Sequence, residues 1–466
     1  MFRSVPVISS FAVAAVLGAC AYAQGARDTA QSIEITADMP TSGTNLIDLY
    51  KYFHANPELS FKEVRSSTIM ANELESLGFE VTTGLGDDWT KAKSMRDNGV
   101  VRDKVGGYGL VGVYRNGDGP TVLIRADMDA LPVAERTGVP FASRIIDETW
   151  TGVTNGVMHA CGHDIHMTSW VGTARNLIAA KDDWSGTLIM IAQPAEELGN
   201  GAQAMIEDGL FDRFPRPDYN LALHVSASVP SGKVAYSSGY ALANVDSVDI
   251  TVKGIGGHGA YPHTTKDPVI VGASIVTAIQ TLVSRNVDPQ TPAVVTVGSF
   301  QAGAKHNIIS DEAKLLLTVR SYDDETRAML LEGIERIARA QALAFGAPEP
   351  EIFIDPDYTP STYNDPDLSA KAAAAIGSVI GAENISEVAP VMGGEDFSQY
   401  SRTDAKIPSM IFWVGAVEPT KWEAAQDSAL GLPSLHSPFF APDYEPTIET
   451  GVASMTATAL ALFEDG

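Results

Sequence analysis

Strands and helices alternate along most of this chain, and that order limits the folds open to it. Apolar strands are predicted at 109–115, 121–127, 186–193 and 219–225, with a helix at about 164–181 between the second and the third. Strands that alternate with helices are typical of an α/β layer on a mostly parallel sheet. In such sheets, ligands bind at the carboxyl ends of the strands.

A different order interrupts this alternation. Between residues 239 and 357 a strand, a helix, two strands, a long helix and a strand follow one another, which is the order of a compact βαββαβ, ferredoxin-like unit. Helix–strand alternation then resumes and ends in a helix. We therefore predict a catalytic domain made of 44–238 and 358–466, with 239–357 as an inserted domain.

The first 23 residues have the pattern of an export signal. Arg3 precedes a short apolar stretch, and small residues follow it. Cleavage after Ala23 fits a signal peptide, whereas LGAC resembles a lipoprotein site at which Cys20 would carry the lipid. Both alternatives stay open, and both predict export to the bacterial periplasm, as a soluble or a lipid-anchored protein. Residues 24–43 are polar and are expected to be a flexible lead-in.

Charge and cysteine content narrow the function further. The formal net charge of −26 argues against nucleic acid as a partner. The two cysteines are Cys20 and Cys161, and processing removes or lipidates the first of them. Cys161 therefore has no partner for an internal disulfide, and its presence in an exported chain needs another explanation.

The segment CGHD places a thiol and an imidazole two residues apart. Cys161 and His163 can chelate a divalent metal only if the backbone turns between them, which Gly162 permits. Asp164 could then orient a ligand. The alternative is a buried cysteine beside surface histidines, and CGHD alone does not decide between them.

Further candidate ligands follow apolar strands. Glu196 and Glu197 come directly after one strand, so that one carboxylate can bind a metal while the other takes a proton from activated water. His224 closes another strand, and His436 lies in a proline-bracketed loop. Each has a structural alternative by itself, either a solvated acidic loop or a structural histidine. Together with Cys161 and His163, they are what a two-metal hydrolytic site needs.

Three other interpretations have weaker support. GIGGHG at 254–259 matches a dinucleotide fingerprint, but no helix follows it and no acidic residue stands where a ribose partner is expected; the glycines would instead present His258 in a turn. A nucleophilic Cys161 would leave the paired glutamates without a role and its thiolate open to oxidation. A binding protein on an inactive hydrolase fold is the non-enzymatic alternative, and the retained Glu196 counts against it.

Seven motifs occur in order along residues 44–466: FHANPELSFKE, RADMDALP, MHACGHDIH, QPAEE, GGHGAYPH, HNIISD and MGGEDFS. On these motifs the chain resembles the metal-dependent aminoacylase-like amidohydrolases, a group that includes hippurate hydrolases, N-acyl-amino-acid amidohydrolases and auxin-conjugate hydrolases. The resemblance implies a dinuclear-metal exopeptidase-type catalytic domain with an inserted lid and dimerisation domain, and hence a homodimer.

The resemblance also implies a set of metal ligands. They would be Cys161, His163, Glu197, His224 and His436. Cys161 would stand near or between two divalent ions, for which zinc or manganese is expected first and cobalt or nickel are alternatives. Asp127 resembles a residue that supports these ligands from behind.

Catalytic and substrate-binding roles follow from the same resemblance. Glu196 would be the general base, and His258 would stabilise the oxyanion, reaching the active site of the partner subunit. Asn307 and Arg320 match positions that hold the substrate's carboxylate. The implied reaction is hydrolysis of N-acyl or N-aroyl amino acids, with a carboxypeptidase or dipeptidase acting on small peptides as the alternative.

Three segments are longer than the resemblance would lead one to expect. They are 86–105, 143–157 and 418–435. The first and most of the third are polar and are expected to be long surface loops. The last two adjoin predicted ligands, so we expect them to reshape the substrate entrance.

Overall fold

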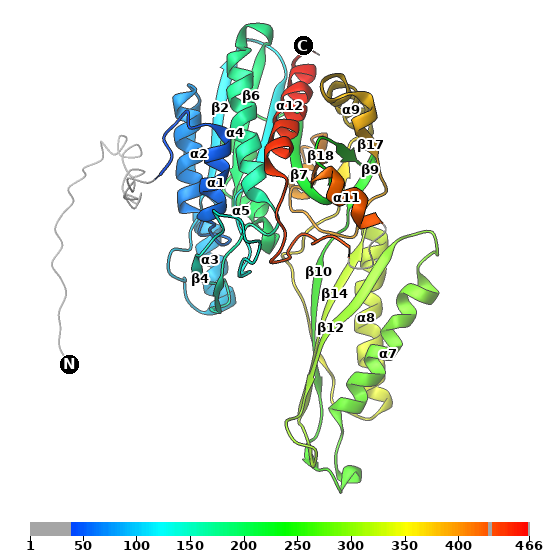
Figure 1. The fold of residues 1–466 in the computed structure, drawn as a ribbon. Coiled ribbons are helices and arrows are strands. Elements are labelled where there is room, and N and C mark those ends of the chain that lie inside the picture. The colour runs from blue at the N-terminus through cyan, green and yellow to red at the C-terminus, as the bar shows by residue number, and fades with distance from the viewer. Residues whose placement is uncertain (1–38, 427–430, 465–466) are drawn as a thin grey trace, which may run out of the picture. The chain divides into compact units, whose positions relative to one another are not determined.

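The computed structural model describes residues 39–426 and 431–464, and from Pro40 onward the chain is one compact unit. The predicted signal peptide, Cys20 and most of the predicted lead-in lie outside the described residues. Within them, eight strands form one mixed sheet in the order β1-β2-β6-β3-β7-β18-β8-β17 (Figure 1). The predicted α/β fold is confirmed.

The sheet is parallel in its centre, with antiparallel pairs on both sides. Its strands are β1 (Glu80–Leu85), β2 (Gly109–Asn116), β6 (Gly186–Gln193), β3 (Thr121–Asp127), β7 (Tyr219–Pro230), β18 (Ser409–Val417), β8 (Val234–Tyr236) and β17 (Ile385–Glu387). Strands β6, β3, β7 and β18 pair with one another in parallel. On one side β2 runs antiparallel to β1 and β6, and on the other β8 runs antiparallel to β18. The parallel strands are almost continuously apolar and buried, as strands covered on both faces must be.

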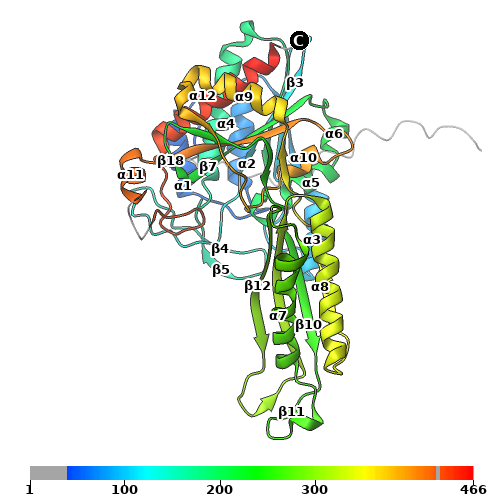
Figure 2. The same cartoon turned by 90° about the vertical axis from the view of Figure 1, so that its right-hand side faces the viewer.

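Helices cover both faces of this sheet (Figure 2). On one side lie α1 (Leu46–Ala55), α2 (Val64–Ser76), α4 (His163–Ala179), α9 (Pro366–Ile380) and α12 (Tyr444–Phe463), of which α4 and α12 contact β3 and β7. On the other, α5 (Gly201–Glu207), α6 (Leu210–Arg213) and α10 (Ser398–Ser401) contribute to a core with residues such as Leu123 and Ile189 of the sheet. Because both faces are covered, the carboxyl edge of the parallel strands is where polar side chains can gather.

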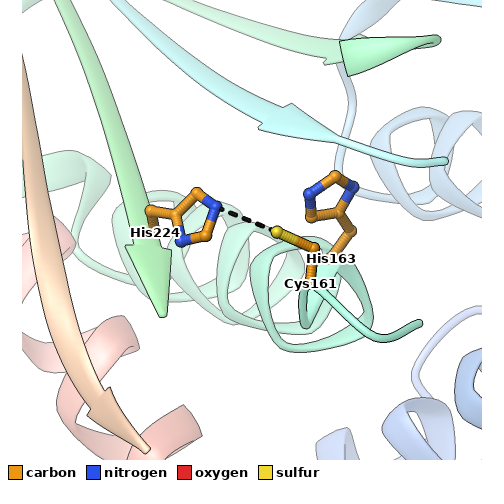
Figure 3. A group of neighbouring side chains, drawn as sticks. All are labelled: Cys161, His163 and His224. Carbon is orange, nitrogen blue, oxygen red and sulfur yellow. Dashed lines mark hydrogen bonds between the residues drawn. The ribbon is translucent and has the colours of Figure 1, made fainter. Parts of the chain in front are cut away.

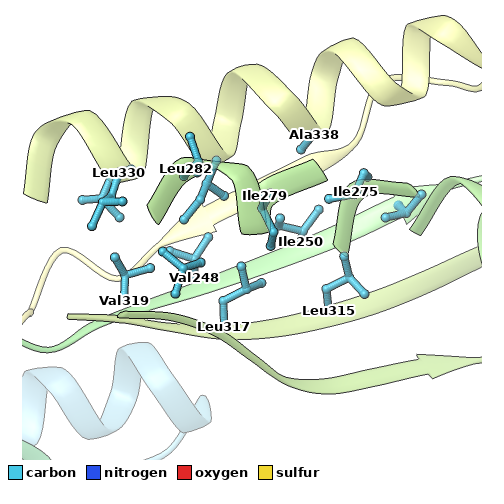
Figure 4. Packing of buried hydrophobic residues seen from close by; sticks show 14 of the residues in the cluster. Val248, Ile250, Ile275, Ile279, Leu282, Leu315, Leu317, Val319, Leu330 and Ala338 are labelled. Atoms are coloured by element: carbon cyan, nitrogen blue, oxygen red, sulfur yellow. The ribbon is translucent and has the colours of Figure 1, made fainter. Parts of the chain in front are cut away.

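The predicted βαββαβ order is observed in the inserted segment. It runs β10 (Asp246–Lys253), α7 (Pro268–Asn286), β12 (Ala293–Ala302), β14 (Glu312–Ser321), α8 (Asp324–Ala344) and β15 (Glu351–Ile354). The strands form an antiparallel sheet in the order β12-β14-β10-β15, and α7 and α8 pack on one of its faces (Figure 4). Val248 and Ile250 of β10 alternate towards this core. The domain limits at 239 and 357 stay a prediction.

Among the described helices, α7 has the length and hydropathy that a membrane span would need. Its side chains Val271, Ile275 and Ile279 are instead buried in the core of the inserted segment. Short strand pairs complete the structure: β4 (Ile146–Glu148) with β5 (Thr154–Gly156), β9 (Gly239–Leu242) with β16 (Thr362–Asn364), and β11 (Gly257–His258) with β13 (Ile308–Ile309).

The expectation of an irregular loop over 86–105 is wrong, because it contains α3 (Asp87–Asn98). The sequence of this helix has no apolar periodicity, and polar contacts connect the helix to the rest of the chain. Lys93 Nζ lies 3.0 Å from Asp357 Oδ2, in the chain leaving the inserted segment. Trp150 Nε1 donates to Asp97 Oδ2 at 3.2 Å, so the segment 143–157 packs against α3.

Residues 418–432, also expected to be an irregular loop, contain α11 (Pro419–Gln426). The Glu418 carboxylate accepts hydrogen bonds from the backbone N–H groups of Thr420 and Lys421, at 3.0 and 3.1 Å. The indole Nε1–H of Trp422 donates to the Ser228 carbonyl at the end of β7, at 2.8 Å. A capped first turn and one anchoring contact, rather than an apolar stripe, therefore hold this helix.

Candidate metal centre

The predicted ligands meet at the carboxyl edge of the parallel strands. β3 and β6 end in register, with Asp127 opposite Gln193, and Glu196 follows three residues later. α4 begins at His163. His224 does not close its strand as expected, because β7 continues to Pro230; it lies within β7, two residues beyond the position that pairs with β3.

The Cys161 thiol is buried and faces an imidazole. Gly162 has φ of +84°, the turn that the sequence predicted between Cys161 and His163. Cys161 Sγ lies 3.4 Å from His224 Nε2 (Figure 3). His224 Nδ1 is 2.7 Å from the Val225 carbonyl, which can only accept, so Nδ1 carries the proton and Nε2 can accept a hydrogen bond from the Cys161 thiol.

Two groups of donor atoms share this sulfur. Cys161, His163 and His224 form one group, and Cys161, Glu197 and His436 form the other; within each, the candidate ligand atoms lie within 4.8 Å of one another. The structure therefore brings together all five predicted ligands. His436 reaches the site from its loop because its backbone N–H donates to the Ala160 carbonyl at 2.9 Å.

Orphaned polar atoms test whether this donor set fits a metal. His163 Nε2 and Glu197 Oε1 are both buried without a hydrogen-bond partner, and they lie 3.9 Å apart. A buried polar atom left unpaired costs about 1–3 kcal/mol. Thiolate, imidazole and carboxylate donors are the ligands that a borderline divalent ion takes, so the residues present fit a metal.

Negative charge is also in excess here. The carboxylates that gather behind and beside the donor groups are Asp127, Asp129, Glu196, Glu197, Glu395 and Asp396. Arg125 is fully buried among them, with its guanidinium nitrogens 2.7 to 3.1 Å from Asp127, Glu395 and Asp396. Burial lowers the pKa of His163, but Asp127 and Asp129 outweigh it and raise that pKa to about 10. One guanidinium and one imidazole do not balance six carboxylates, and a bound cation would reduce the excess.

Burial among these carboxylates shifts the pKa values of Glu196 and Glu197. Burial raises the pKa of Glu196 well above its usual range, and the neighbouring Glu395 raises it further. Burial raises the pKa of Glu197 to about 8, although His163 opposes the shift. Burial likewise raises the pKa of the Cys161 thiol, and Glu197 adds to the effect. A nearby cation would reverse each of these shifts.

Sequence reasoning missed two residues that build the site. Asp129 accepts hydrogen bonds from the backbone N–H groups of Glu196 and Glu197, each at 3.0 Å, and so fixes both glutamates. Arg125 holds the carboxylates behind them. The available signals were the second aspartate of RADMDALP and a charged residue inside an apolar strand, which must be paired once it is buried.

Asp127 and His166 form a support on the other side of His163. His166 Nδ1 donates to Asp127 Oδ1 at 2.6 Å, and Nε2 accepts from the Val225 N–H at 2.9 Å. Both ring nitrogens are thus engaged, which leaves His166 without a free lone pair for a metal. Asp127 Oδ2 lies 3.7 Å from His163 Nε2. Although burial opposes its charge, Arg125 holds the pKa of Asp127 well below its usual range.

Asp164 was expected to orient a metal ligand, but its side chain contacts His54 of α1 instead. Asp164 Oδ2 lies 2.7 Å from His54 Nδ1, and His54 Nε2 lies 3.1 Å from Glu135 Oε1. Burial disfavours protonation of His54, but hydrogen bonds to the two carboxylates outweigh it and raise its pKa to about 9. Asp164 therefore ties α4 to α1.

A cavity of about 1170 Å³ opens over the donor groups. Arg320 lines it, and its guanidinium donates to the Met392 carbonyl and to Thr318 Oγ1, both at 3.1 Å. Among the described residues no carboxylate pairs with Arg320. Residues of 418–435 line the cavity, whereas none of 143–157 does. The expected effect on the substrate entrance therefore fails for 143–157, which packs on α3.

His258 and Asn307 lie together but away from this cavity. His258 is the last residue of β11, and Asn307 directly precedes β13. The two strands pair, and the Gly259 N–H donates to the Asn307 carbonyl at 2.9 Å. Both side chains are exposed, and neither is among the described residues that line the cavity.

Residues 123–459 match Peptidase family M20/M25/M40. The chain is 36% identical over 372 residues to a Saccharolobus solfataricus protein named thermostable carboxypeptidase 2, covering 79% of this chain and 85% of that protein. It is 37% identical over 347 residues to hippurate hydrolase of Campylobacter jejuni, covering 74% and 82%. A solved Bacillus subtilis structure, described as a dinuclear metal binding peptidase from the M20 family, matches with a TM-score of 0.67 and 28% identity, covering 90% and 98%.

Proposed function

Because this chain belongs to peptidase family M20/M25/M40, it is a hydrolase acting on amide bonds, and we propose that its substrates are N-acyl or N-aroyl amino acids. The proposal rests above all on one observation: two donor groups share Cys161 in the same cavity as Arg320. A metal centre beside a guanidinium without a carboxylate partner suits an amide that stands next to a free carboxylate.

We further propose two divalent ions, with zinc or manganese expected first and cobalt or nickel as alternatives. Cys161, His163 and His224 would hold one ion, and Cys161, Glu197 and His436 the other. Bound there, the ions would supply the Lewis acidity that activates water and polarises the amide carbonyl. The shared sulfur explains why the thiol stands without a disulfide partner.

Glu196 is the proposed general base. Its backbone is fixed by Asp129, and its carboxylate lines the cavity beside the donor groups. There it would accept a proton from the attacking water and deliver that proton to the leaving amine nitrogen. Arg320 would hold the substrate's carboxylate, which sets the amide in place relative to Glu196.

His258 and Asn307 would act from a second copy of the chain. Both are exposed and lie outside the cavity of their own chain, on the short strand pair of the inserted segment. In a homodimer formed through the inserted domain, His258 would stabilise the oxyanion and Asn307 would contact the substrate's carboxylate. The exposed position of both residues supports the predicted dimer, because each active site would then need residues of both subunits.

A carboxypeptidase or dipeptidase is the second candidate. The similarity to a protein named thermostable carboxypeptidase 2 favours it, and the same donor groups, Glu196 and Arg320 would perform that reaction. The two candidates differ in whether an acyl group or an amino-acid residue precedes the cleaved amide.

A substrate panel with metal analysis tests these proposals. The purified protein is loaded with zinc or manganese and assayed on N-acetyl and N-benzoyl amino acids and on dipeptides, with metal content measured in the same sample. We expect turnover of the acyl amino acids, and loss of metal and activity together in Cys161→Ser. Turnover of dipeptides alone would favour the second candidate, and a Cys161→Ser protein with full metal and activity would contradict the proposed centre.

Export to the periplasm is also proposed, on the pattern of residues 1–23. Mass spectrometry of the protein from a fractionated bacterial host distinguishes the two processing alternatives. Cleavage after Ala23 leaves an unmodified N-terminus, whereas the lipoprotein alternative leaves a lipid on Cys20. Full-length protein in the cytoplasmic fraction would contradict export.

A further inference from the structure

Many of the side chains that line the cavity are apolar and have no part in the chemistry proposed above. We call six of them the apolar wall: Val229, Ala235, Val388, Trp413, Trp422 and Leu432. Among the described lining residues, the carboxylates and the guanidinium are those of Glu196, Glu197, Glu395 and Arg320, so charge is confined to the donor groups and to the carboxylate-binding position. Val388 is 40% exposed and lines the cavity, and pockets that bind small molecules are lined mostly by apolar side chains.

Trp413 connects this wall to the metal centre. It lies on β18 in register with His224 on the parallel strand β7. Residues paired in this way project their side chains to the same face of a sheet, so Trp413 lies beside a proposed ligand. Its partner on the other side is Ala235 of β8, which also lines the cavity, and the Trp413 ring packs in part on the core of the sheet.

Trp422 closes the wall from outside the sheet. It belongs to α11, in the segment that leads from β18 to His436, and this segment is longer here than the family resemblance led us to expect. The hydrogen bond from the indole N–H to the Ser228 carbonyl, 2.8 Å long, fixes the ring at the end of β7. Trp413 on β18 and Trp422, held against the end of β7, therefore both line the cavity beside the strand that carries His224.

We propose that this wall is the subsite for the acyl group, that it selects uncharged aromatic acyl groups such as benzoyl, and that Trp422 determines this selectivity. The inference rests on the proposed function, because it presumes that an acyl amino acid occupies the cavity. With Arg320 holding the carboxylate, the acyl group extends to the opposite side of the cleaved amide. Aromatic rings bury large areas and stack on tryptophan, whereas a charged acyl group would lose its hydration without gaining a partner.

Substitution of Trp422 in the zinc-loaded protein tests the proposal. We compare kcat/KM for the N-benzoyl, N-acetyl and N-succinyl derivatives of one amino acid. The wild type should prefer benzoyl, and Trp422→Ala should lower the benzoyl-to-acetyl ratio of kcat/KM on the order of tenfold. Trp422→Phe keeps an aromatic ring without the N–H donor and should keep most of the preference. Glu423→Ala, at an exposed neighbouring position of α11, is the matched control and should change nothing.

Equilibrium binding gives a second readout that does not require turnover. Calorimetry on Glu196→Gln protein, with and without Trp422→Ala, compares the affinities for the same three derivatives. An unchanged benzoyl-to-acetyl ratio in both readouts, or an equal loss for all three derivatives, overturns the inference while the proposed function stands. If the wild type hydrolyses none of them but the binding preference falls in the Trp422→Ala protein, the proposed function fails and the subsite stands.

Discussion

Glu196 and Glu197 are neighbours in sequence, but their carboxylates have different surroundings. Glu197 Oε1 lies 3.6 Å from His436 Nε2 and has no hydrogen-bond partner, which suits a ligand. Glu196 also groups with Glu395 and Asp396, the carboxylates that Arg125 holds. Their different partners let one side chain bind metal while the other moves protons, a division that the sequence motif QPAEE allowed but could not assign by itself.

Glu196→Gln separates these roles. The amide keeps the size of the side chain but cannot take a proton, so kcat should fall by roughly 10²–10⁴ while the metal content stays at the wild-type level. Glu197→Gln is the matched variant and should lose metal. Steady-state kinetics and metal analysis on the same preparations check both results, and wild-type turnover in Glu196→Gln would remove Glu196 from the proposed mechanism.

His54 makes stability depend on pH. Its pKa is raised to about 9 in the folded protein, against about 6.5 in an unfolded chain. The folded state therefore binds the proton more tightly, so the stabilisation is complete below pH 6.5 and is lost as the pH rises through 9. The full effect is about 3 kcal/mol.

Denaturant unfolding between pH 6 and 9.5 at a fixed metal concentration measures this effect. The stability of the wild type should fall across the range more steeply than that of His54→Gln. His263→Gln, which replaces an exposed histidine of the inserted segment, should follow the wild type. Parallel curves for wild type and His54→Gln would show that the ion pairs of His54 do not contribute.

At the scale of elements, the turn before α4 positions two of the five proposed ligands, Cys161 and His163. Gly162 has a positive φ, and a Cβ placed on it would come within 2.5 Å of Val225 Cγ2. Val225 follows His224 and donates its N–H to His166. The close approach of this turn to β7 therefore sets the distance between Cys161 and His224.

Gly162→Ala should destabilise the protein by about 1–3 kcal/mol through backbone strain and the contact with Val225, and it should weaken metal binding. Gly232→Ala is the matched control, because Gly232 also has a positive φ, +82°, but open space around it. Thermal unfolding and metal titration of both variants separate strain from displacement of β7. Equal losses in the two variants would show that the contact with Val225 has no effect.

The elements that the sequence pattern predicted are stabilised differently from those that it did not predict. Apolar periodicity predicted the central strands and the βαββαβ order because those elements bury a regular face. It could not find α3 or α11, because their contacts include polar ones to residues far along the chain, such as Asp357 and Ser228, rather than a regular apolar face. The ion pair between Arg125 and Glu395 could not be predicted from the sequence pattern either, since the two residues are 270 positions apart.

At the scale of the whole molecule, the predicted active site is divided. Donor groups, Glu196 and Arg320 share one cavity, whereas His258 and Asn307 are exposed on the inserted segment. All of these residues were predicted from the sequence, and the family resemblance alone assigned His258 to the active site of the partner subunit. A second copy that brings His258 to the cavity would complete the site.

Mixing two inactive variants tests this arrangement. His258→Ala and Glu196→Gln should each be inactive as homodimers, and an equal mixture refolded together should regain about a quarter of wild-type activity if subunits pair at random. Each mixed dimer then has one site with an intact Glu196 and an intact His258. No recovery in a mixture shown to be dimeric would place His258 outside the partner's active site.

The surplus of buried carboxylates around Arg125 has a consequence for the lifetime of the protein. If the proposed ions bind there, they stabilise the folded state, and by mass action a free ion at a hundred times its dissociation constant contributes about 2.7 kcal/mol. Metal scarcity would therefore lower not only the turnover of each molecule but also the number of molecules that survive proteolysis. The abundance of this hydrolase would then follow the supply of its ion.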